Sequence, residues 1–226
     1  MSSSNNNRYS RQEGLVPRER LEGLAIGVIG VGAIGRQVAL QLASLGARQI
    51  TLVDFDEVEE VNITTQGYLW EDLGKSKVLA TAQAISRIDS SVEVSQICAR
   101  YRPGLPVGDA IFGGVDSISA RSAIWRAAGR NAQFWVDGRM LGEVIRVLSV
   151  AGDEGRDYYP TTLFAQAEAM TGACTARGVI YTAAIAAGLM TGQFTRWLRG
   201  LPTDSDLSLN LLASELNVTE PGMSAT

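Results

Sequence analysis

One stretch of the sequence constrains the fold of this chain more than any other. Residues 25–29 form a short apolar run, residues 30–35 read Gly-Val-Gly-Ala-Ile-Gly, a helical pattern follows, and a second apolar run ends at Asp54. A strand, a glycine turn, a helix and a second strand ending in an acid make the unit that binds a nucleotide, with the acid placed to accept hydrogen bonds from a ribose. The stretch therefore predicts a nucleotide site; the alternative is a structural unit with an empty turn.

Each position of the turn has a physical role in this prediction. Gly30 permits the tight turn, Gly32 lets a phosphate approach the backbone, and Gly35 lets the helix lie close to the strand. The first helical residues, Ala33 and Ile34, offer free N–H groups and a partial positive charge to a phosphate. The motif does not distinguish among NAD, FAD and ATP.

The rest of the chain alternates between strand-like and helix-like segments. We expect further strands at residues 92–97, 110–114, 134–136, 143–150 and 206–212, and helices at 17–24, 74–88, 119–129 and 176–198. We expect a loop at 57–70, a turn at 137–139 and an irregular surface loop at 152–173. This order predicts an α/β, doubly wound, mostly parallel sheet with added antiparallel strands at one edge. We expect one domain over residues 8–216, between a disordered tail at 1–7 and a fraying tail at 217–226.

Composition excludes several kinds of chemistry. The 226 residues include no histidine and two cysteines, Cys98 and Cys174, so a Ser-His-Asp triad and a four-cysteine or mixed cysteine–histidine zinc site within one chain are ruled out. The net charge of −4 argues against a broad nucleic-acid-binding face. No apolar run is long enough to cross a membrane, and the first residues lack an export signal, so we expect a cytoplasmic protein. Cys98 lies on a predicted strand, where we expect it in the core.

Six short motifs occur in an order that carries a family resemblance. They are RYSRQ at residues 8–12, GVGAIG at 30–35, LVDFD at 52–56, Asn62, the glycine and lysine of 74–77, and GVDS at 114–117. Over roughly residues 8–200 the chain resembles the ThiF/MoeB adenylyltransferases, which are relatives of the ubiquitin-activating enzymes. The resemblance implies a homodimeric enzyme that uses ATP and Mg²⁺. Its product would be an acyl-adenylate on the C-terminal glycine tail of a small ubiquitin-like or sulfur-carrier protein, with release of pyrophosphate.

The same resemblance implies catalytic roles for three charged residues. Arg11 matches an arginine that reaches the ATP phosphates, usually across a dimer interface. Lys77 matches a lysine that contacts the phosphates, and Asp116 matches the aspartate that binds Mg²⁺ near the α-phosphate. The alternatives are a surface arginine, a solvated lysine in a first helical turn, and a simple helix N-terminal anion. A carboxylate that attacks a triphosphate needs cations and a hard metal, and it needs no histidine.

Further positions complete the predicted site. Asp54 would hold the ATP ribose, and Asn62 and Gln66 would line the phosphate site; the alternative for Asn62 is that it shapes a turn. Asp56 is either a second acid near the metal or a solvated loop acid. Cys174 matches a cysteine that receives the activated carboxylate or sulfur in some members, and the alternative is an inert buried cysteine.

The chain departs from the family pattern at two points. The family usually has an arginine three residues after the asparagine, and Thr65 stands there instead. Arg139 is a candidate replacement, with a structural ion pair as its alternative. The family's paired CxxC motifs are absent, so we expect no zinc.

Two other functions remain open on the sequence alone. An NAD(P)-dependent oxidoreductase would share the glycine turn but would leave RYSRQ, Lys77 and Asp116 unexplained. A non-catalytic subunit that binds a nucleotide or a partner is compatible with Thr65 and the missing cysteines. The sequence does not specify the carrier protein, the pathway or the final product.

Overall fold

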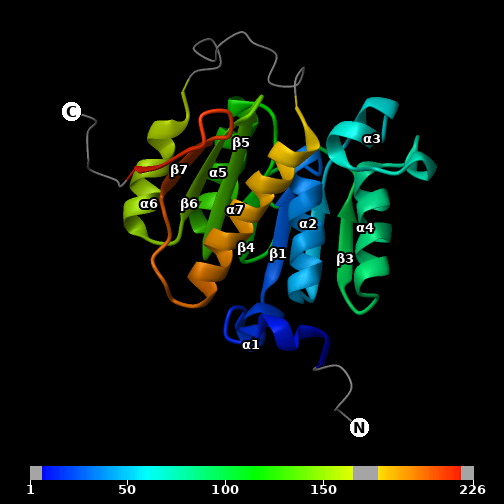
Figure 1. Ribbon diagram of the computed structural model, residues 1–226, viewed down its shortest axis with the longest axis horizontal. Helices are drawn as coiled ribbons and strands as arrows, with labels where there is room; N and C mark the ends of the chain where they lie inside the picture. Colours follow the sequence, from blue (N-terminus) through cyan, green and yellow to red (C-terminus); the bar gives the residue numbers. More distant parts are fainter. Residues whose placement is uncertain (1–6, 165–177, 220–226) are drawn as a thin grey trace.

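An eight-stranded sheet organises residues 7–164 and 178–219, which are the residues that the computed structural model describes (Figure 1). Its strand order is β3-β2-β1-β4-β5-β6-β7-β8. The strands are β1 (Ala25–Ile29), β2 (Gln49–Val53), β3 (Glu93–Ile97), β4 (Ala110–Gly113), β5 (Phe134–Leu141), β6 (Val144–Val150), β7 (Asp206–Asn210) and β8 (Glu215–Thr219). The first five are parallel, and β6 to β8 join antiparallel. The predicted fold class is therefore confirmed.

Helices cover both faces of this sheet. One face carries α2 (Ala33–Leu45), α4 (Lys77–Ile88) and α7 (Ile180–Leu198), and the other carries α5 (Ile118–Ala127) and α6 (Asp153–Tyr158) (Figure 1). Alternate strand residues point to opposite faces, so neighbouring residues such as Val28 and Ile29 enter two different apolar clusters. The short elements are α1 (Arg18–Glu22), α3 (Glu60–Gln66), η1 (Asn7–Gln12), η2 (Trp70–Asp72), η3 (Gly129–Asn131) and η4 (Tyr159–Thr162).

Two segments that we expected to be irregular are partly helical. The expected loop at 57–70 contains α3, which ends at Gly67 with a φ of 76°. This helix is short and only part of it is buried. It therefore contains too few apolar residues to show a clear helical period of hydrophobicity. The expected irregular loop at 152–173 begins with α6 and η4.

Two expectations about strands were also wrong. Asp137, Gly138 and Arg139 continue β5, and the chain turns later, at Gly142 with a φ of 59°. Gly138 is there for packing, since a Cβ on it would lie 2.4 Å from the sulfur of Met190. The segment expected to fray from residue 217 forms β8, which pairs with β7 as far as Thr219.

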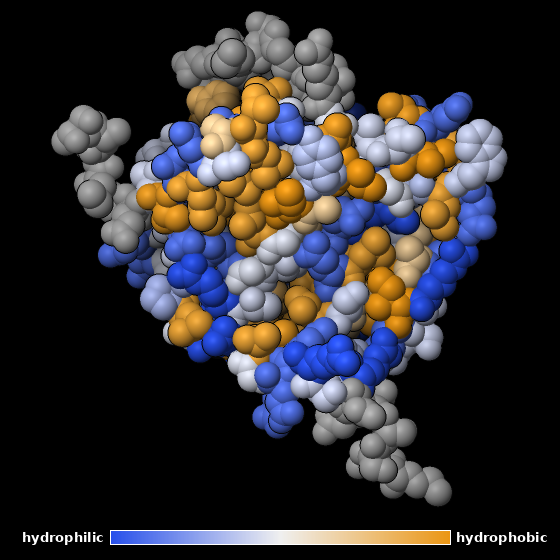
Figure 2. Space-filling view, viewed as in Figure 1, coloured by the Kyte–Doolittle hydropathy of each residue, from blue (hydrophilic) through white to orange (hydrophobic). Residues whose placement is uncertain are grey.

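Apolar side chains also gather on the outer surface (Figure 2). Over α7 and the β7–β8 hairpin the exposed ones include Ile180, Ile185, Leu216 and Val218. Within the described ranges, no helix combines the length and apolar character that crossing a membrane requires.

Candidate nucleotide site

The glycine turn between β1 and α2 is fixed by backbone contacts. Gly30 has a φ of 85°, and a Cβ on it would lie 2.7 Å from the carbonyl of Gly114. A Cβ on Gly35 would lie 1.8 Å from the carbonyl oxygen of Gly30. At Gly32 the nearest atom to such a Cβ is the side-chain oxygen of Gln66, at 3.8 Å. Two of the glycines are therefore required by close packing, whereas Gly32 faces space that a ligand can enter.

Val31, in the middle of the turn, is held from both sides. Its N–H donates to Oδ2 of Asp54 at 2.6 Å, and its carbonyl accepts from the hydroxyl of Tyr68 at 2.6 Å. Oδ1 of Asp54 accepts from the N–H of Asp56 at 2.8 Å. Burial raises the pKa of Asp54, and these two N–H donors oppose that rise. Asp54 therefore stabilises the turn through these hydrogen bonds, and its contact with a ribose remains a prediction.

Gln66 presents an unsatisfied acceptor to this turn. Its Oε1 is buried and has no hydrogen-bond partner among the described residues. Buried polar atoms in folded proteins are almost always paired, so an orphan of this kind beside Gly32 fits a ligand that brings a donor. Asn62 lies one turn earlier on α3 and is also buried, with its Oδ1 accepting from the N–H of Glu59 at 2.9 Å. That bond gives Asn62 the local structural role that was its alternative, on the same helix face as Gln66.

Lys77 and Asp56 meet at the same end of the sheet. Lys77 is the first residue of α4, and its Nζ lies 3.1 Å from Oδ2 of Asp56. The lysine side chain is 8% exposed and the aspartate side chain 46% exposed. Asp56 therefore acts as the partner of a nearly buried lysine, and an incoming anion would compete with it for that charge.

Asp116 is exposed in the loop that follows β4. That loop starts beside the turn, because the N–H of Gly114 donates to the carbonyl of Ile29 at 2.8 Å. Arg121 anchors it by donating to the carbonyl of Val115 and pairing with the buried Asp137. No group of three or more histidine, cysteine or acidic side chains is arranged to hold a metal in the described ranges. A single exposed carboxylate fits Mg²⁺ that is held mainly by a substrate's phosphates and water.

Arg139 serves a structural ion pair. Its Nε donates to Asp137 at 2.8 Å, and its other nitrogens donate to the carbonyl and hydroxyl of Thr162 at 2.9 and 3.1 Å. Burial lowers its pKa. These contacts match the structural ion pair that was the alternative role for Arg139.

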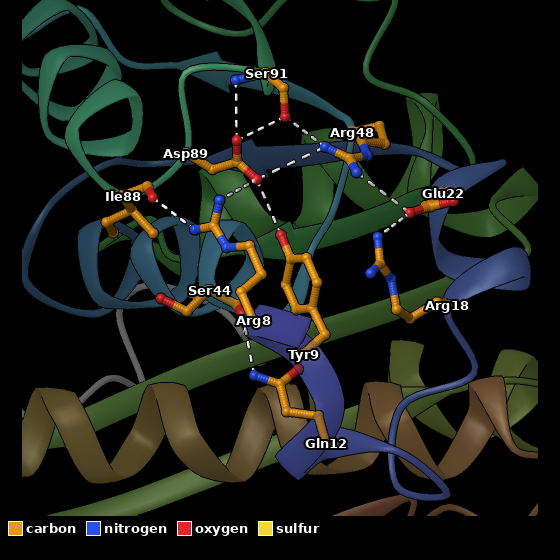
Figure 3. Close-up of polar contacts among 10 residues, drawn as sticks. All are labelled: Arg8, Tyr9, Gln12, Arg18, Glu22, Ser44, Arg48, Ile88, Asp89 and Ser91. Carbon is orange, nitrogen blue, oxygen red and sulfur yellow. Dashed lines mark hydrogen bonds and ion pairs between the residues drawn. The ribbon is translucent and has the colours of Figure 1, made fainter. Parts of the chain in front are cut away.

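Arg11 belongs to η1, which lies at the opposite end of the sheet from the glycine turn, and Figure 3 shows the contacts of its neighbours Tyr9 and Gln12 there. Its neighbour Gln12 donates to the carbonyl of Ser44 near the end of α2, and Tyr9 donates to Asp89 at the end of α4, at 3.1 and 2.9 Å. The glycine turn is at the other end of α2, whose 13 residues span about 20 Å. The structure therefore brings together the predicted residues of the turn, Asp54, Asp56, Gln66 and Lys77, and separates the exposed Arg11 from them.

The two cysteines have different outcomes. Cys174 lies outside the described residues. Cys98 is exposed rather than in the core, because it follows β3, which is an edge strand.

Two residues beside the turn, Tyr68 and Arg36, were not predicted from the sequence. The only sequence signals were an arginine directly after the last glycine of the turn and a tyrosine two residues after Gln66.

Two curated relatives match part of the chain. The chain is 36% identical over 110 residues to the adenylyltransferase and sulfurtransferase MOCS3 of Bos taurus, covering 46% of this chain and 23% of that protein. It is 29% identical over 157 residues to the probable adenylyltransferase/sulfurtransferase MoeZ of Mycobacterium tuberculosis, covering 58% and 40%. It thus spans less than half the length of either relative.

Solved structures share the fold. The crystal structure of E. coli MccB with ATP superposes with a TM-score of 0.73 at 19% identity, covering 97% of this chain and 73% of that one. The model of the ThiF family matches residues 6–222, which is nearly all of the sequence. The chain belongs to the ThiF family.

Proposed function

We propose that this chain is an ATP-dependent adenylyltransferase that activates the C-terminal carboxylate of a small ubiquitin-like or sulfur-carrier protein. The observation that carries the proposal is the open backbone at Gly32 facing the unpartnered Oε1 of Gln66, with Lys77 at the same end of the sheet. Membership of the ThiF family and the names of the matched adenylyltransferases support it, as does a structural neighbour that contains ATP.

In this reaction the residues bind and orient two anions. The N–H groups that begin α2 and the ammonium of Lys77 hold the phosphates, with Lys77 partly released from Asp56. A carboxylate oxygen of the carrier attacks the α-phosphorus of ATP, the bond to the β-phosphate oxygen breaks, and pyrophosphate leaves as the acyl-adenylate forms. Asp116 would hold Mg²⁺, which supplies charge stabilisation to the phosphate oxygens when bound.

The acceptor is proposed to be a protein tail. Relatives include ubiquitin-like modifier-activating enzymes, and MccB has been crystallised with MccA. The exposed apolar side chains over α7 and the β7–β8 hairpin are compatible with a protein partner. Arg11 is proposed to act from a second copy of the chain, because its own turn lies at the far end of α2.

Pyrophosphate exchange tests this proposal directly. We expect the purified chain, with Mg²⁺ and a small protein from the same genome that ends in Gly-Gly, to exchange labelled pyrophosphate into ATP. Asp116→Asn should reduce the exchange rate strongly. Absence of exchange with every such protein, although ATP still binds, would favour the second candidate.

That second candidate is a subunit that binds nucleotide without turnover. One observation favours it: Thr65 replaces the usual arginine, and its hydroxyl donates to the carbonyl of Val61 in its own helix at 2.7 Å. Binding of NADH in preference to ATP, measured by nicotinamide fluorescence, would instead favour an oxidoreductase.

A further inference from the structure

Arg36 is a buried cation that forms no ion pair with an acidic side chain of the described residues. It follows Gly35 in the first turns of α2 and is 3% exposed. In the described part of the chain, no carboxylate oxygen lies within the 4.0 Å of an ion pair with it. Asp72, whose charge acts on Arg36 from beyond that distance, pairs directly with Lys75 at 3.1 Å.

All the contacts that Arg36 makes are with neutral groups. Its Nε donates to the carbonyl of Gly67 and one terminal nitrogen donates to the hydroxyl of Thr81, both at 3.1 Å. Its guanidinium lies 4.1 Å from the centre of the Tyr68 ring. These contacts satisfy the hydrogen-bond geometry of the guanidinium, but among the described residues no ion-pair contact meets its charge, and Asp72 acts on it only from beyond ion-pair distance.

A buried cation that lacks an ion-pair contact raises the free energy of the folded chain. Transfer of a charge out of water is unfavourable unless an opposite charge meets it, and a cation is also disfavoured near the N-terminus of a helix. Methionine would fill a similar volume without either penalty. A cation in such a place is well suited to an anion that arrives from outside the chain.

The position of Arg36 indicates which anion that is. Its guanidinium stacks on Tyr68, and the hydroxyl of Tyr68 donates to Val31 in the glycine turn. Asp54 and Asp56 bring two negative charges to this end of the sheet, and Lys77 balances only one of them. Without Arg36 these three side chains carry a net charge of −1, which opposes the approach of a phosphate group to the N–H groups that begin α2.

We propose that Arg36 supplies the buried positive charge that attracts the nucleotide's phosphates to the glycine turn. It acts through the field and through Tyr68 rather than by touching the ligand, so it is a positioning residue. The inference rests on the proposed use of ATP. It also accounts for a phosphate site whose usual arginine is replaced by Thr65.

The experiment compares a charged with an uncharged ligand. We expect Arg36→Met to weaken ATP binding about tenfold, because a unit charge on the order of 10 Å away in a medium of effective dielectric constant about 20 contributes about that much. Adenosine, which lacks phosphate, should bind equally well to both proteins. Calorimetric titration of each purified protein gives the two dissociation constants.

A control removes the same charge elsewhere. Arg87 pairs with Glu71 on the surface, with side chains 63% and 57% exposed, so Arg87→Met should leave both dissociation constants unchanged. Arg36→Lys keeps the charge but loses the pair of hydrogen bonds to Gly67 and Thr81. We expect its ratio of ATP to adenosine affinity to match that of the parent protein. If Arg36→Met does not fold, Arg36→Gln decides the question, because it removes the charge but keeps hydrogen-bond donors, and its ratio should fall as expected for Arg36→Met.

The outcomes separate this inference from the proposed function. If the parent protein binds no ATP, the proposed function is wrong and this inference falls with it. If the parent binds ATP and Arg36→Met loses ATP and adenosine affinity equally, or neither, Arg36 is only structural. A lowered affinity ratio in Arg36→Lys would also overturn the charge argument.

Discussion

Tyr68→Phe removes one oxygen atom from beneath the glycine turn. Tyr68 is 1% exposed, and its hydroxyl donates to the carbonyl of Val31 at 2.6 Å and lies 3.3 Å from the hydroxyl of Thr81. The substitution leaves a buried carbonyl without its partner, which costs about 1–3 kcal/mol in free energy of unfolding. For a domain of this size, about 2 kcal/mol lowers the Tm by about 4–8 °C.

Urea unfolding followed by circular dichroism measures this loss. A matched control is Tyr181→Phe, because Tyr181 is 48% exposed and its hydroxyl donates to Glu143 at the surface of the molecule. We expect that control to change the free energy of unfolding by less than about 0.5 kcal/mol. If Tyr68→Phe is as stable as the parent within the same margin, the Val31 carbonyl does not depend on Tyr68 and our account of the turn is wrong.

Three further predictions follow from the same structure. Gly35→Ala should destabilise the chain by about 3 kcal/mol or more, because its Cβ would meet the backbone, whereas Gly188→Ala, where a Cβ meets nothing within 4 Å, should stabilise it by about 0.5–1 kcal/mol; urea unfolding compares them. The hydrogen bond from Ser91 lowers the pKa of Asp89 from 3.8 to about 2, so the stability it contributes is present above about pH 4 and is lost as the pH falls toward 2. Unfolding measured across that range should show a flatter profile for Asp89→Asn, and an unchanged slope would contradict this reasoning. Mixing inactive Arg11→Ala and Lys77→Ala proteins should restore up to about a quarter of the exchange activity if Arg11 acts from a second copy in a two-fold dimer, and no restoration would place its role elsewhere.

The fold was largely predictable because the strands carry their own signal. Three of the parallel strands, β1, β2 and β4, are short, mostly buried and largely apolar, and the glycine turn fixes the connection from β1 to α2. The errors fell where a local rule was overridden by tertiary packing. Asp137-Gly138 is a good turn sequence, yet residues 137–139 pair with β6, so the strand continues, and the sulfur of Met190 occupies the space that a side chain at Gly138 would need.

The site was predictable only where the motif itself forms it. Spacing along the chain placed the glycines and Asp54 together, and the structure brings Lys77 and Gln66 to them. No periodicity could reveal Tyr68 as a neighbour of the turn, or the burial of Arg36, because these residues are held by contacts across 31 to 45 positions of sequence. For such residues the sequence shows only which amino acid is present. An arginine on the buried face of a helix stands out, because apolar packing does not account for it.

The residues of the RYSRQ segment differ in their roles: some anchor the segment, and Arg11 stays exposed. Arg8 and Tyr9 are bound to Asp89, with Nη1 of Arg8 at 3.2 Å, and the ring of Tyr9 lies against Gly46 at the end of α2 (Figure 3). These contacts fix the segment to the ends of two helices whose other ends face the glycine turn, while Arg11 stays exposed. Because α2 is rigid, fixing one end of it sets the distance from Arg11 to the turn, and that distance is too long to close within one chain. This separation supports the proposal that Arg11 serves a turn that belongs to another copy of the chain, because the same contacts that keep it from its own site hold it in a defined position.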